Sequence, residues 1–274
     1  MAGDPRWRRE YGVTCLQTDW NPAHSPEELG AGEIHFLVVD FDKSVHQADM
    51  EMLTEREHIR ASQYLDSDKR QLYLGGRIGL RKLICHYTGL ANESLKFHYG
   101  SRGKPVLANG CDQGDLKFNY TLSRHWGLYA FSWNIELGVD LEVFPRSMNF
   151  EALYKRKMTV SEQNEFDRLP DDFKNEAALH CWTRKEAYGK LLGVGIRYFL
   201  GAVGLFEDLS SPYWQTRPQG LFAQKQSDFG DNTGAKNLLG VQITLPFPGA
   251  ASVMYSSDSL NPDAISFKSF IYQS

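Results

Sequence analysis

Two short acidic patterns constrain this chain more than any other feature. The first lies at residues 138–142, GVDLE, and its alternation predicts a β-strand with Asp140 and Glu142 on the same face. The second is the later run WTRKEAYGKLLG, typical of the end of a helix, in which Glu186 and Lys190 share a face at i and i+4. The glycine that closes this run is a helix stop signal. If the helix packs across the strand, three carboxylates and a lysine meet.

Carboxylates grouped in this way predict a site for a hard cation. Oxygen ligands suit Mg²⁺, which keeps several waters and accepts substrate phosphates. The predicted ligands are Asp140, Glu142 and Glu186. Taken alone, an Asp-x-Glu strand is better explained as a solvated face, and it is the helix motif that favours the metal.

These residues resemble a known family, the 4′-phosphopantetheinyl transferases of the surfactin-synthetase-activating type. The family pattern is Gly-(Val/Ile)-Asp-(Leu/Ile)-Glu, followed later by Trp-(Ser/Thr)-x-Lys-Glu-(Ala/Ser)-x-x-Lys. In this chain both motifs are complete and in order, with 46 positions between Asp140 and Glu186. The resemblance also includes Gly103-Lys104-Pro105 and Phe118-Asn119, and it covers roughly residues 50–205.

The resemblance implies an α+β fold, a pseudo-dimer of two similar α+β halves. We expect residues 1–135 to form the N-terminal half, with an irregular arm over about residues 1–30. Residues 136–274 would form the C-terminal half, which carries the acidic motif. A monomer with internal pseudo-two-fold symmetry follows, although no residue-level repeat links the halves.

Periodicity and stop signals predict the elements of each half. The predicted helices are 53–64, with a capping box at Thr54 and Glu57, then 67–87, 148–154, 159–169 opened by Ser161 and Glu162, and a long helix capped by Asp171 or Asp172. The predicted strands are 33–40, 96–99, 115–121, 127–133, 199–207, 213–216, 238–245 and 251–256, with a polar loop at 225–237.

The resemblance also implies a reaction. The phosphopantetheine arm of coenzyme A moves to a serine of an apo acyl or peptidyl carrier protein, and 3′,5′-ADP leaves. Glu186 is the candidate general base, and Lys190 the candidate partner of the phosphate or the leaving oxygen. An unperturbed glutamate, with a pKa of about 4.3, is a weak base for an alcohol, so the metal and positioning must supply much of the rate.

Basic residues elsewhere in the chain match the family's coenzyme A contacts. Lys104 corresponds to a residue near the adenine and 3′-phosphate, and Lys185 to one near the phosphates, with Lys190 one turn further on. Arg56 and Arg70 fall in the helical region where the family carries basic residues. For each of these, a solvated surface charge is the alternative explanation.

One departure from the family lies after Phe118-Asn119. The family commonly reads Phe-Asn-x-Ser-His-Ser, whereas here Thr121 keeps a hydroxyl and Leu122 replaces the histidine. Thr121 therefore stays a predicted coenzyme A contact. We expect His125, three positions later, to contribute little to binding, because it shares a strand face with Leu122 only if a turn follows residue 123.

Bulk properties exclude several classes of protein. A net charge of −4 over 274 residues disfavours a general nucleic-acid binder, and no apolar run reaches the ~20 residues of a membrane helix. The N-terminus lacks the apolar segment of a signal peptide. The four cysteines are scattered, without metal spacing, so reduced thiols in the cytoplasm are the simplest expectation.

Two other functions stay open. A metal-dependent nuclease also uses clustered carboxylates and a lysine, but such sites usually place Glu-x-Lys on a strand. A non-catalytic relative that only binds carrier proteins is favoured weakly by Leu122 and opposed by the complete carboxylate set.

Overall fold

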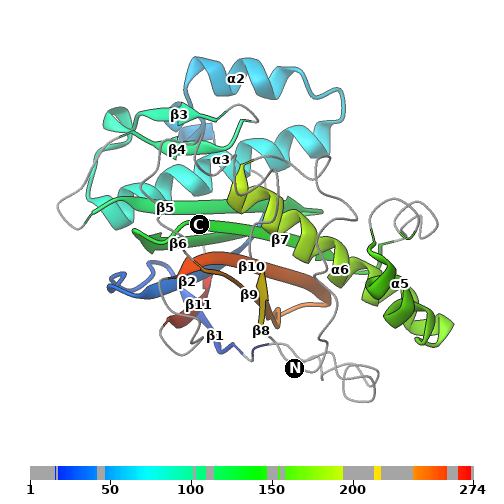
Figure 1. Ribbon diagram of the computed structural model, residues 1–274. Coiled ribbons are helices and arrows are strands. Elements are labelled where there is room, and N and C mark those ends of the chain that lie inside the picture. Colours follow the sequence, from blue (N-terminus) through cyan, green and yellow to red (C-terminus); the bar gives the residue numbers. More distant parts are fainter. Residues whose placement is uncertain are drawn as a thin grey trace. The chain divides into compact units, whose positions relative to one another are not determined.

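The computed structural model describes residues 16, 18–41, 47–100, 103–108, 114–146, 154, 158–193, 213–216, 237–257 and 265–272. The chain forms two compact units (Figure 1). Unit 1 contains Met1–Thr18 and Ile135–Ile265, and unit 2 contains Asp19–Asn134 and Ser266–Ser274. Each unit combines helices with a sheet, so the predicted α+β class is confirmed.

Unit 2 is built on a five-stranded sheet with the order β1-β11-β2-β6-β5. Strand β11 is parallel to both of its neighbours, β1 and β2, whereas β6 is antiparallel to both of its neighbours, β2 and β5. The strands are β1 Trp20–Ala23, β2 Glu33–Asp40, β5 Leu116–Ser123, β6 Trp126–Trp133 and β11 Ser266–Tyr272. A small hairpin joins β3 Phe97–Tyr99 to β4 Pro105–Leu107.

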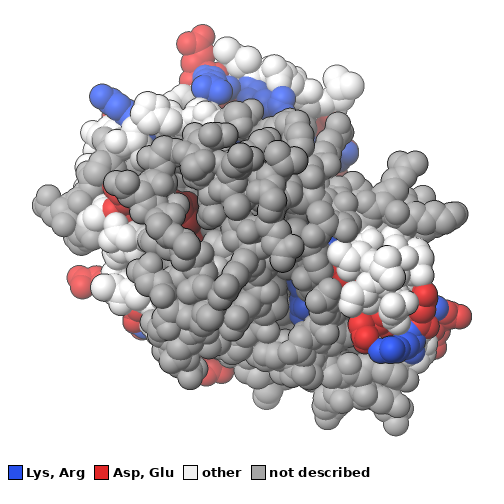
Figure 2. Space-filling model, viewed as in Figure 1, with Lys and Arg blue, Asp and Glu red and all other residues white. Residues whose placement is uncertain are grey.

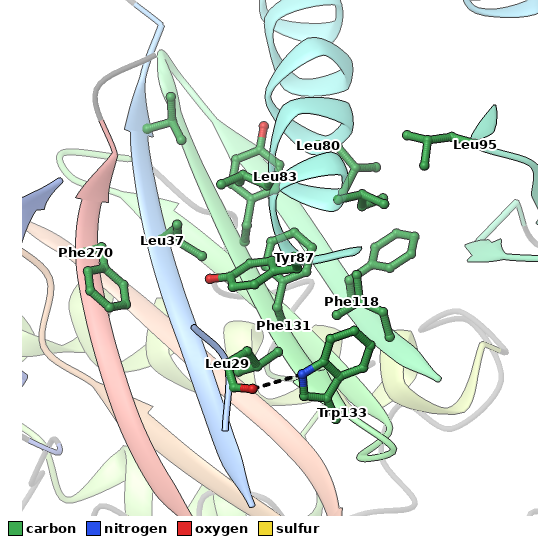
Figure 3. Close-up of a cluster of buried hydrophobic side chains, with 14 residues drawn as sticks. Leu29, Leu37, Leu80, Leu83, Tyr87, Leu95, Phe118, Phe131, Trp133 and Phe270 are labelled. Atoms are coloured by element: carbon green, nitrogen blue, oxygen red, sulfur yellow. Dashed lines mark hydrogen bonds between the residues drawn. The ribbon is translucent and has the colours of Figure 1, made fainter. Parts of the chain in front are cut away.

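The main helix of unit 2 is α3, Ser67–Thr88, which packs against β5. Asp66 caps its first turn, and Gly89 ends it in the left-handed conformation at φ 68°, which glycine adopts without a steric penalty. The apolar core lies between α3 and the sheet (Figure 3). Trp133 satisfies its indole there by donating from Nε1 to the Leu29 carbonyl at 3.0 Å.

A shorter helix, α2 Glu55–Ser62, lies against α3 through a buried ionic cluster. Glu57 closes the predicted capping box with Thr54, which the structure confirms. Its carboxylate also binds the buried guanidinium groups of Arg77 and Arg81. The 3-10 turns η1, Gln47–Met52, and η2, Asn92–Ser94, complete this side of the unit.

Unit 1 carries a four-stranded antiparallel sheet with the order β7-β10-β9-β8. Its strands are β7 Leu137–Val143, β8 Tyr213–Thr216, β9 Asn237–Ile243 and β10 Gly249–Ser257. Helix α5, Val160–Asp167, packs on α6, Asp171–Leu192, and α6 lies across β7 and β10 (Figure 1). Like α3, α6 has 22 residues and ends at a left-handed glycine, Gly193.

The structure differs from the sequence prediction at the chain ends. The expected boundary lies at 135/136, and the observed one lies at 134/135. At the ends of the chain, Met1–Thr18 belongs to unit 1 and Ser266–Ser274 belongs to unit 2. Within the expected irregular arm, Trp20–Ala23 forms strand β1, which pairs with β11 from the other end of the chain. Such pairing between distant segments leaves no local periodicity for a sequence reader to find.

Two helix caps also differ from the prediction. The N-cap of α5 is Thr159, whose hydroxyl accepts from the amide of Glu162, and Ser161 lies inside the helix. The N-cap of α6 is Pro170, and Asp171 contributes charge in the first turn instead of a cap. The predicted strand 199–207 lies outside the described residues, as do nearly all of the predicted helix 148–154 and loop 225–237. Among the helices described, none is long and apolar enough to cross a membrane.

Candidate functional site

The two acidic carboxylates of β7 are buried on one face of the sheet in unit 1. Asp140 and Glu142 are each 5% exposed and alternate with the buried apolar residues of the strand, as predicted. Burial of two carboxylates is costly unless cations or hydrogen bonds compensate them. The surroundings of this strand therefore decide what the site can do.

Helix α6 approaches β7 closely because residue 138 is glycine. A Cβ on Gly138 would stand 2.1 Å from the Ala187 carbonyl oxygen and 2.3 Å from the Leu191 amide nitrogen. No other residue fits at that spacing without movement of the helix backbone. The glycine that opens the acidic strand motif thus sets the distance at which α6 crosses the strand.

This crossing brings the ends of the two motifs together. Lys190 Nζ donates to Asp140 Oδ1 at 2.7 Å. Glu186 lies one helical turn before Lys190 on the same face of α6 and is partly buried. The structure therefore unites Asp140 and Lys190 directly, and it places Glu186 on the helix face that Lys190 shares.

The second carboxylate has a cationic partner that the sequence analysis missed. The Arg146 guanidinium forms an ion pair with Glu142 Oε2, and the Arg146 carbonyl accepts a hydrogen bond from Asn175 of α6 at 3.0 Å. The available signal was a basic residue four positions after Glu142. It was weak because the pairing depends on a turn after the strand.

The carboxylate oxygens suit a hard cation, and two basic side chains of the protein balance the negative charges of Asp140 and Glu142. Two buried carboxylates offer only oxygen ligands, and the Lys190 ammonium and the Arg146 guanidinium supply positive charge beside them. Within the part of the chain that the structure describes, no three His, Cys, Asp or Glu side chains converge as a ready metal centre. The residues fit a divalent ion in type and burial.

A row of polar side chains continues the site across the sheet beneath α6. Asp140 pairs across the strands with Ser252, and Ser252 pairs in turn with Gln242. The hydroxyls of Thr183 and Ser252 lie 2.8 Å apart, and the buried Arg184 donates from Nη2 to Gln242 Oε1 at 2.7 Å. Helix α6 is thus bound by polar contacts to three adjacent strands, β7, β10 and β9.

Lys185, a predicted coenzyme A contact, lies in a different environment. Its side chain is fully buried, and Nζ stands 2.8 Å from Oε2 of Glu162, which is also fully buried. The sequence analysis had read Glu162 only as part of the start of a helix. Its pairing with Lys185 had no local signal, because the two residues are far apart in sequence.

The other predicted cofactor residues belong to unit 2. The exposed Arg56 places its guanidinium 4.0 Å from the centre of the Tyr99 ring. Tyr99 pairs with Pro105 across the small hairpin, whose turn carries the half-buried Lys104. Arg56 and the Gly-Lys-Pro turn are therefore neighbours. Figure 2 shows Lys and Arg at the top of the surface, where α2 lies in Figure 1.

Two further predicted coenzyme A contacts, Arg70 and Thr121, lie on α3 and β5. Arg70 is exposed at the start of α3 and donates to the Tyr64 carbonyl at 2.9 Å. Thr121 is buried in β5, and its neighbour Leu122 faces α3, where a Cβ on Gly76 would stand 2.7 Å from Leu122 Cδ1. Leu122 is thus a packing residue on the strand face opposite Thr121.

Comparisons with known proteins agree with this arrangement. A family model described as the 4′-phosphopantetheinyl transferase superfamily matches residues 136–230, and one described as 4′-phosphopantetheinyl transferase, N-terminal, matches residues 42–132. The two ranges fall on either side of the boundary between Asn134 and Ile135.

Three relatives illustrate the similarity. The 4′-phosphopantetheinyl transferase HetI of Nostoc sp. is 32% identical over 183 residues, which are 66% of this chain and 77% of the relative. The putative 4′-phosphopantetheinyl transferase slr0495 of Synechocystis sp. is 28% identical, over 65% of this chain and 76% of the relative. The L-aminoadipate-semialdehyde dehydrogenase-phosphopantetheinyl transferase of Homo sapiens is 26% identical, over 53% and 49%.

Proposed function

Because this chain belongs to the 4′-phosphopantetheinyl transferase superfamily, we infer that its buried acidic site performs the transfer that gives the family its name. The protein is a transferase that moves 4′-phosphopantetheine to carrier proteins, with coenzyme A as the donor. The observation that carries the assignment of the site is the contact between Lys190 and Asp140, which joins the strand motif to the helix motif.

We propose the following roles in unit 1. Glu186 accepts the proton of the carrier serine, directly or through a water molecule. The serine oxygen forms a bond to the β-phosphorus of coenzyme A, the bond from that phosphorus to the bridging oxygen breaks, and 3′,5′-ADP leaves with the electron pair. Lys190 stabilises the negative charge that develops on the phosphates, and it also orients Asp140.

Asp140, Glu142 and Glu186 are the residues that we propose to hold Mg²⁺. Magnesium supplies charge neutralisation on a pyrophosphate and holds it for in-line attack. The support is the burial of Asp140 and Glu142 and the all-oxygen donor set. In this scheme Arg146 and Lys190 balance the carboxylates when no metal is bound, and each exchanges part of that contact for one with substrate phosphate.

We propose that residues of unit 2 also bind coenzyme A. Arg56 and Lys104 lie next to the same hairpin and offer two positive charges for a phosphate. Arg70 and Thr121 stay proposed contacts on the family resemblance. The protein would act as a monomer with two similar halves, in a reducing cytoplasm where Cys85 and Cys181 stay thiols.

The test is incubation of the purified protein with coenzyme A, Mg²⁺ and a panel of apo carrier proteins, read by intact mass. A gain of one phosphopantetheine on a carrier supports the proposal. Binding of carriers without a mass gain indicates a non-catalytic relative, and cleavage of DNA in place of transfer indicates a nuclease. Titration calorimetry of Mg²⁺ into wild type and Asp140→Asn, each with coenzyme A, tests the metal site without turnover.

A further inference from the structure

Helix α6 packs against other elements on two of its faces. Glu186, the proposed base, is adjacent in sequence to one residue of each face. One stripe, formed by Thr183, Ala187 and Leu191, faces the sheet. The other stripe includes Ala178, Cys181 and Lys185, which pack against α5. The rotation of α6 about its axis is therefore set jointly by the sheet and by α5.

The α5 face contains a buried ion pair in place of a purely apolar contact. Lys185 Nζ stands 2.8 Å from Glu162 Oε2, and neither side chain is exposed to solvent. The same Glu162 oxygen accepts from the Thr159 amide at 2.7 Å, which closes the capping box of α5. The Glu162 carboxylate thus caps the start of α5 and also binds Lys185 of α6, the residue before Glu186.

The thiol of Cys181, next to this ion pair, is also buried. Cys181 lies one turn before Lys185, with its Sγ 4.0 Å from Glu162 Oε1, and burial followed by the nearby Glu162 raises the pKa of the thiol to about 12. Cys181 itself belongs to an apolar cluster of α5 and α6 that also contains Met158 and Phe166. Lys185 therefore points into the contact between the two helices, about 100° around the helix axis from Glu186.

We propose that Lys185 and Glu162 are a positioning pair for Glu186: their buried ion pair fixes the rotation of α6, and Lys185 does not bind the phosphates of coenzyme A. Successive helix residues share one rigid backbone, so loss of the pair rotates or shifts Glu186 together with Lys185. This inference rests on the proposed function in taking Glu186 as the base.

The two roles of Lys185 predict opposite kinetic patterns. If Lys185 binds phosphate, its loss raises KM for coenzyme A by about tenfold or more, and loss of Glu162 has little effect. If the pair positions Glu186, loss of either partner lowers kcat, because a misplacement of about 1 Å costs up to ~100-fold in rate. Removal of one partner leaves the other buried charge without its ion pair, and removal of both does not.

The experiment is a double-mutant cycle on the full chain with Lys185→Met, Glu162→Gln and both together. Glutamine keeps an oxygen for the Thr159 amide. Steady-state kinetics with coenzyme A and a carrier are measured below the unfolding temperature of every variant. We expect each single variant to lose roughly ten- to a hundredfold in kcat, with KM for coenzyme A within about twofold of wild type. We expect the double variant to regain most of the lost kcat.

The matched control is Lys174→Met, the same substitution in an exposed ion pair with Asp171 on α6, which we expect to leave kcat and KM unchanged. The proposal is overturned if Lys185→Met mainly raises KM, if Glu162→Gln has wild-type kcat, or if the double variant is no better than Lys185→Met.

A second measurement keeps the inference independent of turnover. Amide hydrogen exchange of residues 183–190 should rise in Lys185→Met and return toward wild type in the double variant. Unchanged exchange in the single variant would contradict a positioning role even if the protein transferred nothing. Absence of transfer by wild type on every carrier would instead contradict the proposed function.

Discussion

Replacement of Gly138 by alanine tests whether the distance between α6 and β7 determines activity. The added Cβ would stand 2.1 Å from the Ala187 carbonyl oxygen and 2.3 Å from the Leu191 amide nitrogen. Both are backbone atoms of α6, so no change of side-chain rotamer relieves the contact. The helix itself has to move away from the strand, or the strand from the helix.

The size of the movement follows from the geometry. Ordinary van der Waals contact of a Cβ begins at 3.4 Å, so relief of the 2.1 Å contact needs 1.3 Å of separation. A shift of that size stretches the 2.7 Å bond between Lys190 Nζ and Asp140 Oδ1 to about 4 Å, beyond hydrogen-bond range. Overpacking typically costs about 1–3 kcal/mol of stability, and a 1 Å misplacement of catalytic groups up to ~100-fold in rate.

The assay compares transfer rates and thermal unfolding for Gly138→Ala and for a matched control, Gly30→Ala. The three atoms nearest to a Cβ on Gly30 all belong to the side chain of Glu33, the closest at 2.9 Å, and none is a backbone atom, so the control should stay near wild type in both measurements. Gly138→Ala should lose one to two orders of magnitude in kcat, and its unfolding temperature should fall by at least a few degrees. Wild-type turnover and stability in Gly138→Ala would refute the close approach.

Further predictions concern the metal, the partner, the cofactor and pH. Asp140→Ala should lower turnover by orders of magnitude at saturating Mg²⁺, with circular dichroism unchanged. Carrier association should weaken as salt rises, because an acidic carrier needs a basic docking surface. Leu122→His should not lower KM for coenzyme A, since Leu122 faces α3, and His125→Ala should leave that KM unchanged. Burial would raise the pKa of Glu57, but Arg77, the Thr54 amide and Arg81 together outweigh burial and lower it. This stabilisation is present above about pH 4.3 and lost as pH falls through the lowered pKa, so urea titrations should show less acid destabilisation in Glu57→Gln.

Much of the site was predictable because both motifs lie within single elements. Alternation along β7 placed Asp140 and Glu142 on one face of the strand, and the i,i+4 rule placed Glu186 and Lys190 on one face of α6. The capping box at Thr54 was predicted correctly for the same reason, since it joins residues three apart. Local periodicity and local hydrogen bonds are encoded within a few neighbouring residues.

Contacts between elements could not be predicted in this way. The partner of Glu142 is Arg146, and the partner of Lys185 is Glu162, and neither pairing follows from strand or helix periodicity. The exchange of chain ends depends on β11 inserting between β1 and β2, with parallel pairing on both sides. Such long-range choices are set by tertiary packing.

The polar contacts of α6 suggest why this helix carries so many buried charges. A helix that crosses a sheet is usually held by apolar side chains, and replacement of a buried ion pair by apolar residues is often neutral or stabilising. Here the buried Arg184 binds Gln242, Lys185 binds Glu162, and Lys190 reaches Asp140. Hydrogen bonds depend steeply on distance and angle, whereas apolar contacts tolerate sliding and rotation. Three directional contacts, two with the sheet and one with α5, therefore restrict the rotation and translation of the helix more than its stability requires, as the placement of a base against a substrate demands.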